Sequence, residues 1–186
     1  MKQPINTKII TAITFLASFF IITYISCKKG SSASCPYCAN GSECVRDTCR
    51  CPVGYQGQSC DTISRTKFTG AWNVYEKGSL VNTPTQYSIV IYSNNAAAIN
   101  DVLIQNFYNY FASPINANVI NDTLFIPSQT LQGKTMVGKG YILSDSIHGQ
   151  YGLISMYYEI IDSATSLTND FGYITADSSQ PSTWTR

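Results

Sequence analysis

A cysteine-rich stretch decides how the first part of this chain folds: Cys35-Pro-Tyr-Cys38-Ala-Asn-Gly-Ser-Glu-Cys44-Val-Arg-Asp-Thr-Cys49-Arg-Cys51-Pro-Val-Gly54-Tyr55-Gln56-Gly57-Gln-Ser-Cys60. It holds six cysteines in about 26 residues and very few large apolar side chains. Such a segment cannot build an apolar core large enough to fold, so we expect disulfide bonds to hold it. Disulfide bonds persist in oxidising compartments, which places the stretch outside the cytoplasm.

The second half of this stretch carries the most specific pattern. In Cys49-Arg-Cys51 the side chains alternate along an extended strand, so the two sulfur atoms point to opposite faces and cannot pair with each other. The turn Gly54-Tyr55-Gln56-Gly57 reverses the chain before Cys60, because glycine tolerates tight turns, and Tyr55 covers the bridge there. These features resemble an EGF-like module that covers residues 35–60.

The resemblance implies one disulfide pattern: first cysteine to third, second to fourth, and fifth to sixth. In this chain the pattern joins Cys35 to Cys44, Cys38 to Cys49, and Cys51 to Cys60. The cysteine count alone allows fifteen pairings. Calcium-binding members of the family carry acidic and amide residues before the first cysteine. This chain has serine and alanine at those positions, so we expect no metal site.

Reduced cysteines would have other uses. Cys35-Pro-Tyr-Cys38 has the spacing of a redox pair, and the cysteines between Cys35 and Cys51 have ligand atoms for zinc. The redox pair needs a βαβ context that the sequence lacks. Zinc needs thiolates, which an oxidising compartment removes. Cross-linking is therefore the favoured interpretation.

The seventh cysteine, Cys27, follows a signal-like segment. Lys2 and Lys8 give the start of the chain a positive charge, and residues 9–25 are mostly apolar. A small residue, Ser26, stands directly before Cys27. This arrangement resembles a bacterial lipoprotein signal. The resemblance implies that residues 1–26 are a cleaved signal peptide and that the Cys27 thiol carries lipid. Residues 27–34 then form a flexible tether rich in glycine and serine.

Two alternatives stay open for the N-terminal segment. It is long enough for an uncleaved anchor, since about 18 apolar residues just suffice to span a bilayer. Ordinary secretion is the other alternative. In every case the rest of the chain lies outside the cytoplasmic membrane. The lipoprotein interpretation places it in the cell envelope, at the outer membrane, with the membrane itself as a partner.

The charge pattern excludes one class of partner. Charged residues make up 12% of the chain, and the formal net charge is +1. No basic face is visible, so nucleic-acid binding has no electrostatic basis.

Residues 66–186 are predicted to form an antiparallel β-domain. Helical periodicity is almost absent, and β-branched and aromatic residues recur in short runs between turn-forming residues. The expected strands are Gly70–Glu76, Gln86–Tyr92, Asp101–Phe107, Asn116–Ile120, Thr123–Ile126, Met136–Leu143, a stretch within Ile147–Ile161, and Phe171–Thr175. The chain is therefore mostly β, and this domain is either a closed barrel or a two-sheet sandwich.

The first of these strands contains Gly70-Ala-Trp72, which resembles the Gly-x-Trp opening of lipocalin-like barrels. The resemblance implies that Trp72 is buried at the closed end of a barrel. Gly70 lets another strand approach closely. Strand alternation places Val74 and Glu76 on the same face as Trp72. Trp184 lies near the C-terminus, where we expect its loss to have a mild effect on stability.

No catalytic residue is expected. His148 is the single histidine and stands after a turn, where a solvated side chain is the ordinary interpretation. Most carboxylates sit at predicted strand edges, where aspartate forms turns. No glycine-rich phosphate loop follows a strand, so we expect neither an enzyme nor a cofactor.

A repeated Asp-Ser/Thr-apolar pattern resembles O-glycosylation sites of Bacteroidetes envelope proteins. Its acceptor residues are Thr62, Thr123, Ser146 and Ser163. The alternative is that the same pattern ends a turn and begins the next strand.

The order of signal, EGF-like module and lipocalin-like β-domain resembles small lipoproteins of the Bacteroidetes type. We therefore expect a lipid-anchored binding or scaffolding protein whose partner is a protein, a glycan or a small apolar ligand. A lipocalin-like carrier is one alternative, since aromatic residues such as Tyr108, Tyr110 and Tyr158 are frequent in and near the strands. Core packing is the other explanation for them. An envelope hydrolase is a second alternative, which the lone histidine disfavours.

Overall fold

The structure is a computed structural model that describes residues 35, 37–174 and 180–186. The predicted signal peptide, the predicted lipid attachment site Cys27 and the predicted tether lie outside these residues. Within the described part of the chain, no helix has the length and apolarity needed to cross a membrane.

The cysteine-rich region consists of two small antiparallel pairs of strands. β1 (Glu43–Val45) pairs with β2 (Thr48–Arg50), and β3 (Tyr55–Gln56) pairs with β4 (Thr62–Ile63). The β1–β2 turn is tight because Arg46 and Asp47 both adopt positive φ.

Three disulfide bonds hold this region together. They join Cys35 to Cys44, Cys38 to Cys49, and Cys51 to Cys60, which is the pairing that the EGF-like resemblance implies. The sulfur atoms of Cys35, Cys38 and Cys49 lie within 4.8 Å of one another, but each belongs to a disulfide bond. In this oxidised state they offer no thiolate to a metal ion.

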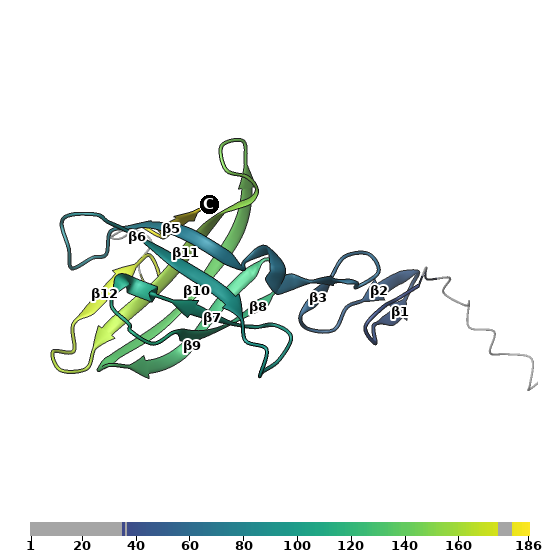
Figure 1. Cartoon of the computed structure of the whole chain (residues 1–186), viewed down its shortest axis with the longest axis horizontal. Helices are drawn as coiled ribbons and strands as arrows, with labels where there is room; N and C mark the ends of the chain where they lie inside the picture. The colour runs from purple at the N-terminus through teal and green to yellow at the C-terminus, as the bar shows by residue number, and fades with distance from the viewer. Residues whose placement is uncertain (1–34, 36, 175–179) are drawn as a thin grey trace, which may run out of the picture. The chain divides into compact units, whose positions relative to one another are not determined.

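The β-domain is an eight-stranded antiparallel barrel (Figure 1). Seven consecutive strands form a meander in which each strand pairs with the next: β5 (Gly70–Glu76), β6 (Thr85–Ser93), β7 (Asp101–Gln105), β8 (Ile115–Ile120), β9 (Thr123–Leu131), β10 (Lys134–Asp145) and β11 (Gly149–Asp162). β13 (Ser182–Thr185) pairs with both β11 and β5 and closes the ring. Closure settles the choice between barrel and sandwich.

Two short strands share the position between β11 and β5. β13 pairs with the stretch Leu153–Met156 of β11, and β12 (Thr168–Phe171) pairs with Glu159–Ile161 further along β11. On its other side β12 bonds to the chain that follows β5, where the Ser79 amide donates to the Asp170 carbonyl at 3.0 Å. The strands β13 and β12 therefore lie one after the other along β11 and together close the barrel between β11 and β5.

The core follows from the alternation of side chains along the strands. On β5 the residues Trp72, Val74 and Glu76 are buried, as the sequence pattern predicts, while their neighbours are exposed. Trp72 donates its indole N–H to the Phe68 carbonyl at 2.7 Å. The Arg186 guanidinium lies 4.3 Å from the centre of the Trp72 ring. These contacts fix Trp72 beside the 3-10 helix η1 (Ser64–Lys67).

Glycines on β10 make room for large side chains on β11. Gly138 pairs with Tyr158, and Gly140 pairs with Met156. A Cβ atom on Gly138 would lie 2.5 Å from the Tyr158 Cβ and 2.8 Å from the Tyr157 carbonyl oxygen. Tyr158 is fully buried with its ring inside the barrel, and this position is possible only because Gly138 has no side chain.

The expectation that the loss of Trp184 has a mild effect on stability is wrong, because Trp184 belongs to the core. Trp184 is 0% exposed, and its ring lies 6.3 Å from that of Phe107 in the core. Its strand, β13, is absent from the sequence-based expectation, because only one large apolar residue marks it. The expected last strand, Phe171–Thr175, is also misplaced, since β12 covers Thr168–Phe171.

Candidate functional site

The open end of the barrel is the edge at which β5, β7, β9 and β11 end. Neighbouring strands run antiparallel, so the loops that follow these strands meet there, opposite the end that holds Trp72. We call this edge the barrel mouth and define it by its lining residues: Glu76, Gly78, Leu80, Val81, Tyr108, Tyr110, Lys134, Asp162, Leu167, Asn169 and Phe171.

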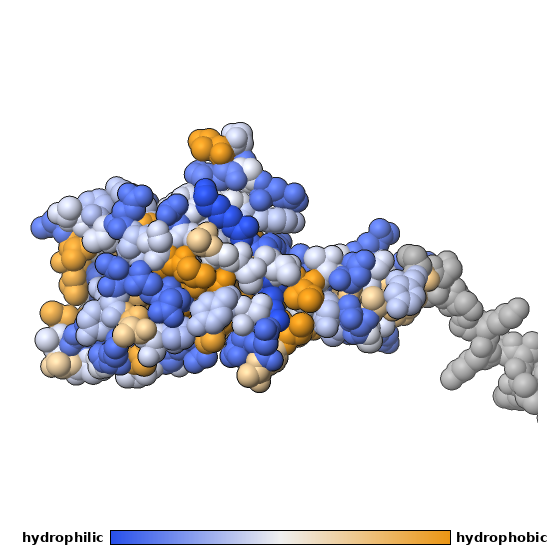
Figure 2. All heavy atoms as spheres, viewed as in Figure 1, coloured by the Kyte–Doolittle hydropathy of each residue, from blue (hydrophilic) through white to orange (hydrophobic). Residues whose placement is uncertain are grey.

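Two half-open hollows lie in the mouth. One has a volume of about 260 Å³ and the other about 150 Å³, and Tyr108 and Asn169 line both. Several large apolar side chains of the rim are about half exposed, among them Leu80, Tyr110 and Leu167. Hydrophobic residues are visible at this end of the barrel in Figure 2, beside the loop that joins β5 and β6. The mouth therefore combines apolar surface with concave shape.

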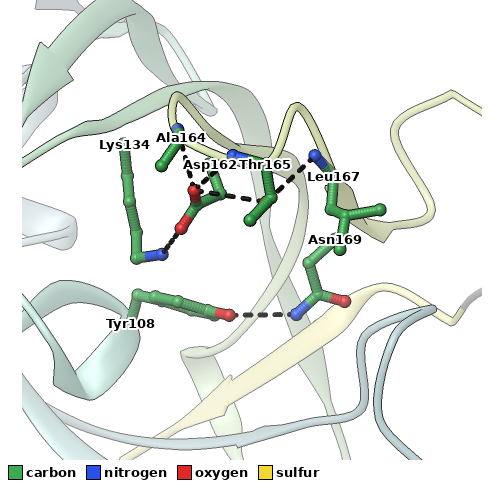
Figure 3. Close-up of polar contacts among 7 residues, drawn as sticks. All are labelled: Tyr108, Lys134, Asp162, Ala164, Thr165, Leu167 and Asn169. Atoms are coloured by element: carbon green, nitrogen blue, oxygen red, sulfur yellow. Dashed lines mark hydrogen bonds and ion pairs between the residues drawn. The ribbon is translucent and has the colours of Figure 1, made fainter.

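Tyr108 reaches the mouth through an unusual backbone. It lies in the 3-10 helix η2 (Phe107–Asn109), and Asn106, Tyr108 and Asn109 all have positive φ. This conformation is costly for a tyrosine and persists only where surrounding contacts impose it. Here the Tyr108 hydroxyl accepts a hydrogen bond of 3.0 Å from the Asn169 amide (Figure 3).

The side-chain amide of Asn169 joins three parts of the mouth. Its nitrogen donates to Tyr108, and its oxygen accepts the Leu80 backbone N–H at 3.0 Å. Gly78 permits this arrangement, because a Cβ atom there would lie 2.1 Å from the amide oxygen. Asn169 on β12 thus fixes both η2 and the β5–β6 loop.

Lys134 and Asp162 form an ion pair beside Tyr108 (Figure 3). Their atoms Nζ and Oδ2 are 2.6 Å apart, and Nζ lies 4.9 Å from the centre of the Tyr110 ring. Asp162 also accepts backbone N–H bonds from Ala164 and Thr165. The Lys134 bond and these amides lower the pKa of Asp162 to about 2.

A buried carboxylate forms the inner wall of the larger hollow. Glu76 is 3% exposed, and its oxygens accept hydrogen bonds from the hydroxyls of Tyr87 at 2.8 Å, Tyr158 at 2.7 Å and Ser182 at 2.7 Å. Burial raises the pKa of Glu76, and the three hydroxyls oppose that rise because they stabilise the charged form. Ser182 is itself held by the Trp184 indole N–H at 2.8 Å.

The residues that the sequence singles out lie mostly away from the mouth, since Gly70 and Trp72 belong to the opposite end of the barrel. The sequence marks Tyr108 and Tyr110 only as two of its many aromatic residues. Glu76 carries a usable signal, because a carboxylate on the apolar face of a strand must find partners. Asn169 and Lys134 carry none.

His148 lies in the β10–β11 turn and is not simply solvated. Its Nδ1 is 2.9 Å from Asp145 Oδ2, and its backbone N–H donates to Asp145 Oδ1. These bonds lower the pKa of Asp145. The pair belongs to the end of the barrel away from the mouth.

The four predicted O-glycosylation residues occupy edges and turns. Thr62, Ser146 and Ser163 are exposed, and Thr123 is half-buried at the start of β9. The carboxylates of Asp145 and Asp162, which precede two of them, accept backbone N–H groups of their own turns. This geometry agrees with the turn interpretation, and modification stays a prediction.

The chain has a distant relative among known proteins, although no family model matches it. Fibropellin-1 of Strongylocentrotus purpuratus is 34% identical over 88 residues, which covers 44% of this chain and 7% of the relative. The chain thus spans only a small part of that protein's length. This distant EGF-like homologue and the three disulfide bonds together identify an EGF-like module, which an eight-stranded antiparallel barrel follows.

Proposed function

We propose that this chain is an exported binding module whose ligand binds at the barrel mouth. One observation carries the proposal: exposed tyrosine and leucine side chains surround half-open hollows that also contain fixed polar groups. Tyrosine suits such a site, because its rigid ring offers a large contact area at a low cost in conformational entropy. The polar groups Asn169, Lys134 and Asp162 are already held in place, so binding does not have to order them.

The packed interior favours the mouth over a deep carrier site. The rings of Phe107 and Tyr158 are 4.9 Å apart, and those of Tyr158 and Phe171 are 4.2 Å apart. Trp184 packs against the same group. Inward side chains that fill a small barrel leave less room for an apolar cargo, so the lipocalin-like carrier is the less supported alternative.

The proposal includes a lipid anchor at Cys27 and a place in the cell envelope, at the outer membrane. Its support is the signal-like segment before Cys27 and the disulfide bonds, which require an oxidising compartment. The tether and the EGF-like module then act as a spacer between membrane and barrel. The role is binding or scaffolding, without catalysis.

A ligand-observed NMR screen of small polar and aromatic fragments tests the binding role. The full-length chain in detergent is compared with Tyr110→Ala and with Tyr141→Ala, which removes a similarly exposed tyrosine from the outer face of β10. We expect fragments to bind the wild type and Tyr141→Ala and to lose affinity for Tyr110→Ala. Equal binding to all three proteins contradicts the proposal.

A further inference from the structure

Among the described residues, the carboxylate of Glu76 has hydroxyl partners but no cationic one. Three hydroxyl groups donate to it, and none of the ion pairs in the described part of the chain includes it. A buried carboxylate either binds a proton or stays ionised with the help of hydrogen bonds and nearby positive charge. The hydroxyls supply the hydrogen bonds, and a bound cation would supply the positive charge that favours the ionised form over the protonated one.

The hollow beside Glu76 has the walls that a cation prefers. Tyr108, Tyr110 and Phe171 line the same space of about 260 Å³ as Glu76 does. Aromatic faces attract cations through the quadrupole of the ring, and sites for quaternary ammonium groups are built from such faces. Thr85 and Asn109 add neutral polar groups to the lining.

Tyr110 already has a cation over its ring. Lys134 Nζ lies 4.9 Å from the ring centre while it pairs with Asp162. The charge of Lys134 is therefore matched by Asp162 and is not free to neutralise Glu76. Lys77, which follows Glu76 in the chain, is exposed and takes part in none of the ion pairs of the described residues. It lines a separate hollow of about 340 Å³ on which Glu76 also borders.

We propose that the larger hollow of the barrel mouth binds an organic cation, with the ammonium group between the Glu76 carboxylate and the tyrosine rings. The inference rests on the proposed function and names its ligand class: a small primary or quaternary amine, free or at the end of a larger molecule. Tyr87 and Tyr158 hold the carboxylate from inside the barrel. Their own pKa values are raised by burial and by Glu76, so both hydroxyls keep their protons and remain donors.

The test compares two probes of the same shape. Choline and its neutral carbon isostere, 3,3-dimethyl-1-butanol, are titrated calorimetrically into the full-length chain in a non-ionic detergent at about pH 8, above the range in which an unperturbed glutamate titrates. We expect choline to bind at least about tenfold more tightly than the isostere. Equal affinities, or no choline binding up to about 10 mM, overturn the inference.

Glu76→Gln keeps the shape of the side chain and removes its charge. We expect this variant to lose the preference for choline while it still binds the neutral isostere. Its melting temperature is measured alongside, and the probe comparison on the wild type stands on its own if the variant fails to fold. Retention of the full preference by folded Glu76→Gln contradicts the role of the carboxylate.

The two proposals fail separately. If neutral fragments bind and Tyr110→Ala abolishes that binding while choline does not bind, the mouth is a binding site and the cation inference is wrong. If no fragment depends on Tyr110, the binding role of the mouth itself is wrong.

Discussion

Trp184 shows how a single residue near a chain end can belong to the centre of the fold. It is fully buried, and its indole N–H donates to Ser182, which in turn donates to Glu76. One residue therefore links the apolar core to the polar wall of the mouth. Its position in the sequence gives no hint of this, because burial depends on where β13 inserts and not on distance from the terminus.

Trp184→Ala should strongly destabilise the barrel. Truncation of a buried tryptophan leaves a large cavity and typically costs about 3–5 kcal/mol, a large part of the roughly 5–15 kcal/mol of a domain. We expect Trp72→Ala to have a similar effect, since both rings are buried. Urea denaturation followed by circular dichroism measures both changes. A loss below about 1 kcal/mol for Trp184→Ala contradicts its assignment to the core.

The Lys134–Asp162 pair should be visible in a pH titration. The pKa of Asp162 is lowered to about 2, so the pair stabilises the fold above the ordinary value of 3.8 and its contribution is lost as pH falls through about 2. Carbon-13 NMR of the Asp162 carboxyl measures this midpoint. Lys134→Met should move it upward, part of the way to 3.8, because the backbone N–H donors remain. An unchanged midpoint in that variant would show that Lys134 does not contact Asp162.

At the scale of elements, the sequence pattern predicts the strands of the meander well, but it misplaces β12 and misses β13, the two strands that close the barrel. The expected bounds of β5 match the observed ones, since alternation and the flanking turn residues mark it clearly. β9 continues to Leu131, past Pro127, where the polar run after Ile126 suggests a loop. Pairing with β10 keeps this run extended, and pairing is a tertiary contact that local pattern does not contain.

The mouth is largely beyond sequence-based prediction for the same reason. The positive φ of Tyr108 has no local cause, because tyrosine does not favour it, and depends on the contacts of η2 with β12. In the sequence Asn169 looks like an ordinary turn-forming residue, and its role depends on Gly78 and Leu80, which lie in the segment beside β12. Glu76 alone stands out, as a carboxylate on a core-facing strand position.

Gly138→Ala should disturb the pairing of β10 with β11. The added Cβ atom would meet the Tyr158 Cβ at 2.5 Å and a backbone carbonyl at 2.8 Å, so neither neighbour can move away freely. Overpacking of this kind typically costs about 1–3 kcal/mol. Lys139→Ala, at the next and exposed position of the same strand, is the matched control. Equal unfolding free energies for the two variants would contradict the close approach of the strands.

At the scale of the whole molecule, the EGF-like module and the barrel obtain their stability in different ways. The module depends on three cross-links, each of which contributes on the order of 3 kcal/mol by limiting the unfolded chain. The barrel depends on one buried apolar cluster. Reducing agents should therefore unfold the module while they leave the barrel folded.

The lipid anchor is a separate prediction. Cys27→Ser removes the thiol that would carry the lipid, so this variant should stay unprocessed and keep residues 1–26, which the mass of the purified chain would show. Mass spectrometry of the wild type should find Cys27 as the modified first residue. A mature chain that still contains residues 1–26 would indicate an uncleaved anchor.

The central claim is that ligands bind at the barrel mouth, and ligand-induced chemical-shift changes in an isotope-labelled sample test it most directly. With a fragment or cation that binds, we predict that the largest changes fall on Gly78, Tyr108 and Asn169. Residues at the opposite end, such as Asn100 and Ile147, should keep their shifts. Changes that gather at the opposite end or in the EGF-like module would contradict the account.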